Sequence, residues 1–259
     1  STTGERIPMC IDARSRMFRA LCLLVATFAA AGPAIASPVT LDNETVTFCQ
    51  DGYPIDAAVD GSFASGSGWA VYGQIGNNQT AVFKASNDLG GSEGTQLTFQ
   101  LHMFWGDAHI LGRFRLSATT SDRSTYGQGS TCNDATPGGS AGWTVLVPQS
   151  VASQNGQTLG VLPDGSVLAS GTNPSGDLVT VQLRTPLKGI TGFRLEALAD
   201  GSFADNGPGR ASNGNFVLNE LTVDASPVAS IPTLDTWAMA LTALLLAGVG
   251  IRGLSLRRS

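Results

Sequence analysis

The chain has 259 residues, of which 42% are hydrophobic and 14% are charged, so it can bury a folded core and is not a wholly disordered protein. Its formal net charge is −5, but residues 1–36 and 231–259 each carry +2, which leaves −9 between them. An acidic middle without a run of Lys and Arg argues against a nucleic-acid partner. The 32 Gly and 12 Pro favour many short strands joined by turns, which makes all-β the expected fold class.

Residues 17–36 have the three-part layout of a secretory signal peptide: a basic start, an apolar run over 20–31 and a small-residue end, Ala-Ile-Ala. We expect an N-terminal signal helix that is cut off after Ala36. Residues 1–16 are then an upstream extension, and Met17 is the true start. This pattern predicts export across the inner membrane to the cell envelope, the cell surface or the exterior.

The C-terminal residues form an apolar run that is followed by a basic tail. No charged residue occurs between Trp237 and Ile251. The run is shorter than the ~20 residues that span a bilayer comfortably, but snorkelling of Arg252 would extend it. We therefore expect a transmembrane helix and basic tail over 237–259, with the tail in the cytoplasm by the positive-inside bias.

A short motif, Ile-Pro-Thr-Leu, stands directly before this run. The order of motif, apolar run and basic tail resembles the IPTL-type C-terminal sorting signal, a relative of the PEP-CTERM signals. The resemblance implies that an exosortase-like membrane transpeptidase processes this end of the chain, so the anchor is either retained or removed. The signal residues are Ile231, Pro232, Thr233, Leu234, Trp237, Arg252, Arg257 and Arg258.

Between the two signals, alternating apolar and polar residues predict short strands with one buried face. The pattern is clear at 113–119, 193–198 and 216–223, the last with a local irregularity. No stretch keeps a helical period for three turns, and no fixed repeat appears. We predict a jelly-roll β-sandwich over 37–226, joined to the C-terminal segment by a linker over 227–236.

Three longer stretches carry a second resemblance: AAVDGSFASGSGWAV at 57–71, LPDGSVLASG at 162–171 and NGPGRASNGNFVLNE at 206–220. Their order is similar to the galactose-binding-like sandwiches, which include the discoidin or coagulation factor C-type domains. In several relatives the first loop and the closing acid hold calcium, which implies Asp60 and Glu220 as ligands of a structural ion. An Asp-capped turn with a surface Glu explains the same two residues without a metal. No other cofactor is expected.

One candidate ligand surface surrounds the stretch MFWGDA, which begins at residue 103. Phe104 and Trp105 could stack on a sugar ring while His102 and His109 contact its hydroxyls. The alternative is that one aromatic ring fills the core and the other lies on the rim. The two histidines are seven residues apart, which matches no common metal signature.

A second candidate ligand surface is the polar loop that contains Arg210, Asn213 and Asn215. Its Gly and Pro residues could equally exist only to turn the chain before the last strand. The sequence contains no Gly-x-Ser-x-Gly, P-loop or His-Glu-x-x-His motif. We therefore predict no catalytic residue and no enzymatic activity.

Cys49 and Cys132 are the two cysteines that remain after the expected cleavage. Export into an oxidising compartment favours a disulfide between them, and closing so long a loop would contribute ~4 kcal/mol. Two free thiols are the alternative, because spacing alone does not bring two sulfur atoms together.

Together these patterns predict an exported envelope or matrix protein with a noncatalytic binding domain. Extracellular carbohydrate is the first ligand class to consider, although a fold does not determine its ligand. The alternatives are a structural surface protein that contacts other proteins, and a polysaccharide-active hydrolase with unrecognised site residues.

Overall fold

The computed structural model describes residues 35–127 and 132–228. The expected signal peptide and the C-terminal sorting segment lie outside these residues. Within the described part of the chain, no helix is both long and apolar enough to cross a membrane.

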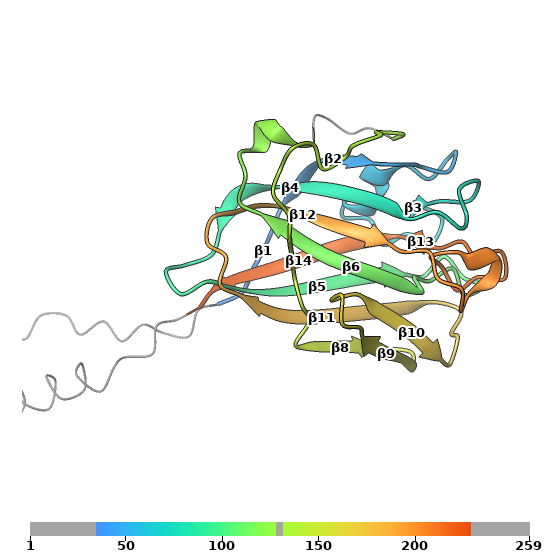
Figure 1. Cartoon of the computed structure of the whole chain (residues 1–259). Coiled ribbons are helices and arrows are strands. Elements are labelled where there is room, and N and C mark those ends of the chain that lie inside the picture. The colour runs from blue at the N-terminus through green and yellow to red at the C-terminus, as the bar shows by residue number, and fades with distance from the viewer. Residues whose placement is uncertain (1–34, 128–131, 229–259) are drawn as a thin grey trace, which may run out of the picture. The chain divides into compact units, whose positions relative to one another are not determined.

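The described residues form an all-β sandwich of two antiparallel sheets (Figure 1). This confirms the predicted sandwich. The first sheet has the strand order β1-β14-β5-β11-β8, and the second has the order β2-β4-β12-β6-β10-β9, with the short strand β7 paired to β6. A separate pair joins β13 to β3, and three short 3₁₀ turns lie in the loops.

The first sheet consists of β1 (Ser37–Pro38), β14 (Glu220–Pro227), β5 (Thr95–Met103), β11 (Asp177–Thr185) and β8 (Ser150–Ser153). The second consists of β2 (Leu41–Val46), β4 (Gln79–Leu89), β12 (Ile190–Ala197), β6 (Arg113–Thr119), β10 (Val167–Gly171), β9 (Gln157–Val161) and β7 (Thr144–Val145). The remaining elements are β3 (Trp69–Ala70), β13 (Val217–Leu218), η1 (Ile55–Ala58), η2 (Arg123–Thr125) and η3 (Ala204–Asn206).

The core lies between the two sheets and follows from residue alternation. In β5 every second side chain is buried, from Leu97 through Phe99 to Met103, while the residues between them point outward. Phe99 meets Phe193 of the opposite sheet edge-on, with ring centroids 5.1 Å apart. This contact joins the middles of the two layers and makes both rings inaccessible to water.

The predicted irregularity in 216–223 is present, because the structure divides this stretch into β13 and β14. Phe216 packs edge-on against the fully buried Trp69, with centroids 5.0 Å apart. Leu221 and Val223 then point into the main core from β14. Asn219 lies at the break, and its backbone N–H donates to the His102 carbonyl at 2.8 Å.

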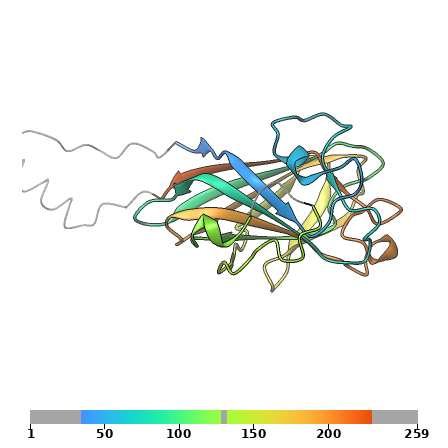
Figure 2. The ribbon, with the colours of Figure 1, turned by 90° about the horizontal axis from the view of Figure 1, so that it is seen from above.

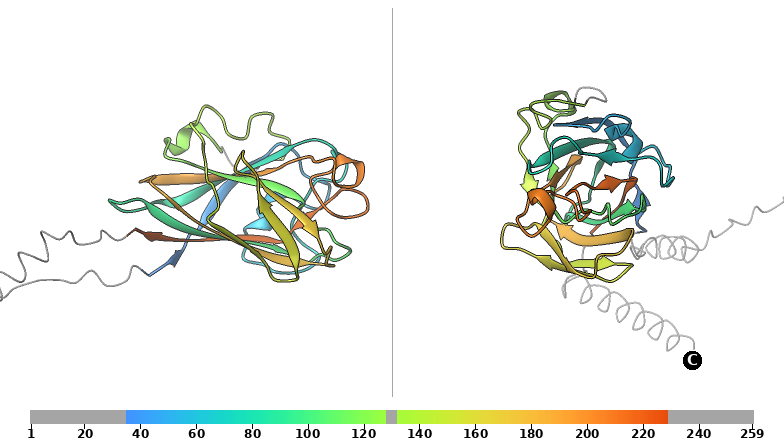
Figure 3. Two further views of the ribbon diagram at one scale, coloured as in Figure 1. Left: turned by 60° about the horizontal axis from the view of Figure 1, so that its bottom comes forward. Right: turned by 90° about the vertical axis from the view of Figure 1, so that its right-hand side faces the viewer.

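The two ends of the sandwich differ. Ser37 pairs with Ala225, and the Val228 N–H bonds to the Gly94 carbonyl in the β4–β5 turn, so both exits of the described chain lie at one end, here called the terminal end. The loops 47–78, 104–112, 172–176 and 198–216 lie at the opposite end, here called the loop end (Figures 1 and 2). Figure 3, right, looks onto the loop end.

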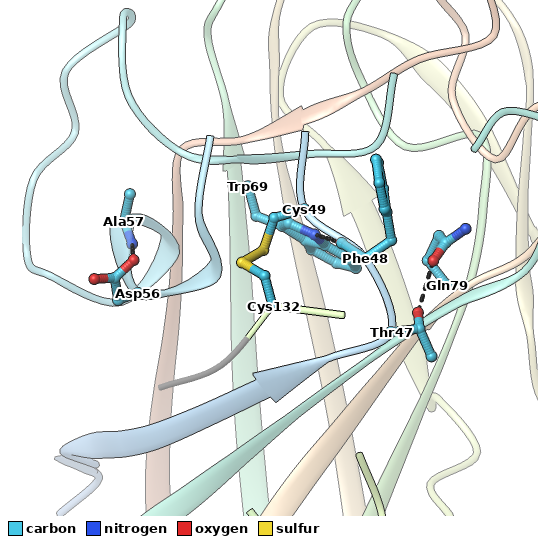
Figure 4. Close-up of a disulfide and its surroundings, with 8 residues drawn as sticks. All are labelled: Thr47, Phe48, Cys49, Asp56, Ala57, Trp69, Gln79 and Cys132. Carbon is cyan, nitrogen blue, oxygen red and sulfur yellow. Dashed lines mark hydrogen bonds between the residues drawn. A yellow bond between two sulfur atoms is a disulfide. The ribbon is translucent and has the colours of Figure 1, made fainter. Parts of the chain in front are cut away.

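A disulfide joins Cys49 and Cys132, whose Cα atoms are 5.4 Å apart, across 83 residues (Figure 4). The chain around Cys132 runs along the edge strand β2, because the Asp134 N–H donates to the Val46 carbonyl at 2.9 Å. Thr45 Oγ1 donates to the Pro137 carbonyl at 3.1 Å. The bond therefore holds a loop over an edge strand that would otherwise offer free backbone groups.

Candidate functional site

Loop 104–112 presents the predicted aromatic pair at the loop end. Phe104 is 38% exposed. Trp105 is half-buried; its Nε1 donates to the Tyr53 hydroxyl at 2.9 Å, and its ring meets the His109 ring edge-on at 4.3 Å between centroids. Neither ring fills the core, so the alternative of one core ring and one rim ring does not hold. The Trp105 and His109 rings are in contact, and Phe104 directly precedes Trp105 in the chain.

Further aromatic side chains lie in other loops of the same end, and no pattern in the sequence singled them out. Phe63 is 55% exposed and Tyr72 is 56% exposed. Both belong to Gly-rich loops, which is the signal that could have identified them, since large rings in such loops have little core to enter. We give the name aromatic rim to five aromatic residues of the loop end: Tyr53, Phe63, Tyr72, Phe104 and Trp105.

The backbone of loop 104–112 is strained next to these rings. Asp107 and Ala108 have φ values of 47° and 58°, a left-handed conformation that is unfavourable for residues other than Gly. Ser175 of loop 172–176 holds them there, because it accepts from the Asp107 N–H through Oγ at 3.2 Å and from the Ala108 N–H through its carbonyl at 3.0 Å. Strain of this kind is typical of ligand-binding loops.

His102 has different neighbours from His109. It lies on the outer face of β5 in register with Glu220 of β14, and the Phe63 ring covers it at 4.6 Å between centroids. Burial lowers the pKa of His102, so its imidazole is neutral at pH 7. Its Nε2 is buried and has no hydrogen-bond partner among the described residues.

The predicted calcium ligands Asp60 and Glu220 lie close enough to interact electrostatically. Glu220 is 4% exposed, which contradicts the alternative of a surface Glu, and its Oε2 has no partner in the described part of the chain. Burial raises the pKa of Glu220 to about 7; a bond from the Gly61 backbone N–H opposes the rise and the Asp60 charge adds to it. A hard cation would stabilise this buried, unpartnered carboxylate oxygen.

The loop around Asp60 can supply further oxygen ligands. Asn219 Nδ2 donates to three backbone carbonyls of this loop, those of Ala64, Ser65 and Ser67, at 3.1, 3.5 and 2.6 Å. Across residues 35–127 and 132–228, no three His, Cys, Asp or Glu side chains could together hold a metal. A calcium ion held by Asp60 and Glu220, with backbone oxygens as its other ligands, stays a prediction. Asp60 Oδ1 also caps the turn by accepting from the Ser62 N–H at 2.7 Å.

Arg210 lines a hollow of about 370 Å³ at the loop end, which we call the Arg210 hollow. Loop 172–176 separates this hollow from the aromatic rim, because Asn173 Nδ2 donates to the Arg210 carbonyl at 3.1 Å while Ser175 contacts loop 104–112. The side chains that line the hollow are those of Ser170, Asn173, Ser202, Phe203, Arg210 and Ser212, with small residues between them.

Asn213 and Asn215 do not line this hollow. Asn215 is 3% exposed, and both ends of its amide are used: Oδ1 accepts from the Val71 N–H at 3.0 Å and Nδ2 donates to Gln50 Oε1 at 3.1 Å. Asn213 Oδ1 accepts from the Asn215 N–H at 3.1 Å. The prediction that Asn215 binds a ligand is therefore wrong, since its amide holds the loops to each other. The amide of Asn213 likewise stabilises the turn in which it lies.

Residues 229–258 match the IPTL-CTERM motif. The predicted sorting signal is confirmed. No curated protein matches the chain in sequence.

Several solved structures are similar to the sandwich. One is the family 32 carbohydrate-binding module of Clostridium perfringens NanJ in complex with galactose, with 10% identity, a TM-score of 0.41, and coverage of 73% of this chain and 99% of the module. Another is from the Streptococcus pneumoniae β-galactosidase BgaA, with 10% identity, a TM-score of 0.40, and coverage of 74% and 92%. A third is CBM32-3 from a Clostridium perfringens family 31 glycoside hydrolase, with 12% identity, a TM-score of 0.38, and coverage of 76% and 98%. The similarity is one of fold.

Proposed function

We propose that this protein is an exported, noncatalytic glycan-binding protein of the cell envelope. The observation that carries the proposal is that the aromatic rim and the Arg210 hollow both lie at the loop end, with loop 172–176 between them. Sugar sites combine an apolar platform with a few directed polar groups. The rim supplies exposed ring surface at Phe63, Tyr72 and Phe104, and the hollow supplies hydroxyl, amide and guanidinium groups.

The position of the chain exits supports this proposal. Ser37 and Val228 leave the sandwich at the terminal end, and the sorting segment follows Val228 in the sequence. A protein held at the membrane or joined to an envelope component through that segment is attached at the terminal end. The loop end is then the part of the sandwich that is free to meet a ligand.

The sorting motif supports the export part of the proposal. The uncharged run from Trp237 to Ile251 would hold the precursor in the membrane, and an exosortase-like transpeptidase would cut near Pro232. Intact-mass measurement of the protein from a host with the matching machinery tests this step. We expect loss of both ends in the native protein and retention of the C-terminal segment in Pro232→Ala. A complete C-terminus in both would contradict it.

A glycan array tests the binding function. We expect the purified protein to bind at least one oligosaccharide without turning it over, and Phe104→Ala to weaken binding about tenfold, because the variant removes exposed ring surface. Val147→Ala is the matched control, since Val147 is 60% exposed and lies outside the loop end. Equal glycan affinities of the two variants would show that the aromatic rim is not part of the binding site. Self-association without sugar binding would favour a structural surface protein, and turnover would favour a hydrolase.

We also propose a structural calcium ion between Asp60 and Glu220. It would neutralise the two carboxylates and fix loop 60–68 over the outer face of the first sheet. Through Asn219, this loop is linked to the aromatic rim, because Asn219 Oδ1 accepts from the Phe104 N–H. Calcium would thereby stabilise the ligand-binding end without contacting the sugar.

A further inference from the structure

Arg210 differs from the other described arginines in its charge environment. Arg113, Arg115, Arg123 and Arg194 each have a carboxylate within 4.0 Å, and Arg184 is exposed on β11. Arg210 is half-buried and forms no ion pair with any described residue. Burial lowers the pKa of Arg210, and the charge of Asp177 opposes this shift. A partly desolvated guanidinium without a carboxylate partner is costly unless a ligand supplies the missing charge.

Arg210 is held by direct bonds to neutral groups only, and the charge of the buried Asp177 acts on it without a direct ion pair. Its Nη1 donates to Gln157 Oε1 at 2.8 Å and to the Thr172 carbonyl at 2.7 Å, and its Nη2 donates to the Gly171 carbonyl at 2.9 Å. Gln157 is held in turn by the fully buried Asp177, because Gln157 Nε2 donates to Asp177 Oδ2 at 2.6 Å. The guanidinium is therefore rigidly placed by neutral acceptors.

These bonds leave a donor pair unused. A guanidinium has five N–H groups, and three of those of Arg210 have an acceptor among the described residues. The Nε–H and one Nη2–H remain. In this same molecule Arg115 uses its Nε and Nη2 to bind both oxygens of Glu196, at 2.8 and 2.9 Å. Arg210 has the same two donor atoms, and no carboxylate of the described residues is bound to them.

The surroundings of Arg210 favour an anionic sugar. Among the residues that line the Arg210 hollow, it is the only charged one. The Phe203 ring supplies an apolar wall, and it lies so close to the Gly112 backbone that a Cβ there would come within 2.3 Å of it. Asp205 and Asn206, directly after the lining residue Ala204, have strained φ values of 51° and 53°, as expected of a loop shaped for a ligand.

We propose that the Arg210 hollow binds a uronic acid residue of an oligosaccharide, with the sugar carboxylate on the unused Nε and Nη2 donors of Arg210 and the sugar ring against Phe203. A carboxylate is planar and matches two parallel N–H donors. This inference rests on the proposed glycan-binding function and names the chemical class of its ligand.

Calorimetric titration of the full-length protein tests this inference. The probes are trisaccharides of galacturonate, glucuronate and mannuronate, each beside its uncharged methyl ester. We expect at least one acid to bind tenfold or more tightly than its ester, because a charge-assisted bidentate contact is worth about ten- to a hundredfold in affinity. We expect Arg210→Gln to abolish this difference and Arg184→Gln, the matched control, to retain it.

Two results would overturn the inference: an acid and ester that bind equally for all three sugars, or an acid preference that survives in Arg210→Gln. If Arg210→Gln does not fold, Arg210→Lys decides the question, because lysine keeps the charge but lacks the planar donor pair; we expect it to bind the acid at least threefold more weakly than the native protein. Neutral sugars bound at the aromatic rim without any acid preference would contradict this inference alone. The absence of all glycan binding would contradict the proposed function as well.

Discussion

Glu220→Gln is expected to change the pH dependence of stability. The pKa of Glu220 rises from its ordinary 4.5 to about 7 in the folded protein, so folding is favoured when the carboxyl is protonated. That contribution is fully present below pH 4.5 and is lost as the pH rises through about 7. At 1.36 kcal/mol per pKa unit the loss is about 3 kcal/mol in the absence of calcium. The neutral glutamine removes this dependence.

The assay is urea unfolding in a chelator at pH 4.5, 6 and 8, followed by the same series with calcium. In chelator we expect the native protein to lose stability towards pH 8 by more than Glu220→Gln does, and calcium to restore the native protein only. Glu93→Gln is the matched control, because Glu93 is exposed in the β4–β5 turn and should behave as the native protein. The reasoning is refuted if the native protein and Glu220→Gln have the same pH dependence.

Two further predictions concern the Cys49–Cys132 disulfide and the Phe203 ring of the loop end. Replacing Cys49 and Cys132 together by Ser should lower the free energy of unfolding by about 4.5 kcal/mol, which is the loop-entropy value for the 83-residue separation. An unchanged urea-unfolding midpoint would contradict this prediction. Gly112→Ala should displace the Phe203 ring, which a Cβ would approach to 2.3 Å, and so weaken glycan binding. Gly142→Ala is the control, because a Cβ at Gly142 has open space and this variant should bind as the native protein does. Equal glycan affinities of the two variants would exclude Phe203 from the site.

The strands could be predicted because their residue pattern has a period of two. In β6, β12 and β14 the alternation of apolar and polar residues is enough to identify one buried face. The break within 216–223 was also visible, since Phe216 and Leu218 are in phase with each other but not with Leu221. The pairing of these strands was not predictable, because it depends on contacts between residues far apart in the chain.

The candidate site was only partly predictable, for a physical reason. Loop residues have no period, so the sequence does not distinguish a displayed amide from a buried one. Asn215 and Arg210 stand in the same polar loop, yet Asn215 is buried with its amide bonded within the protein, and Arg210 lines a hollow. Phe203 was missed because nothing in its sequence neighbourhood marks it as lining the same hollow as Arg210.

The central claim is that the loop end binds carbohydrate. Hydrogen exchange of the native protein, with and without an oligosaccharide selected on the array, tests it most directly. We expect slower exchange of the backbone amides in 104–112, 172–176 and 203–212, with no change at the β4–β5 turn of the terminal end. Protection confined to the terminal end or to the outer faces of the sheets would contradict the account.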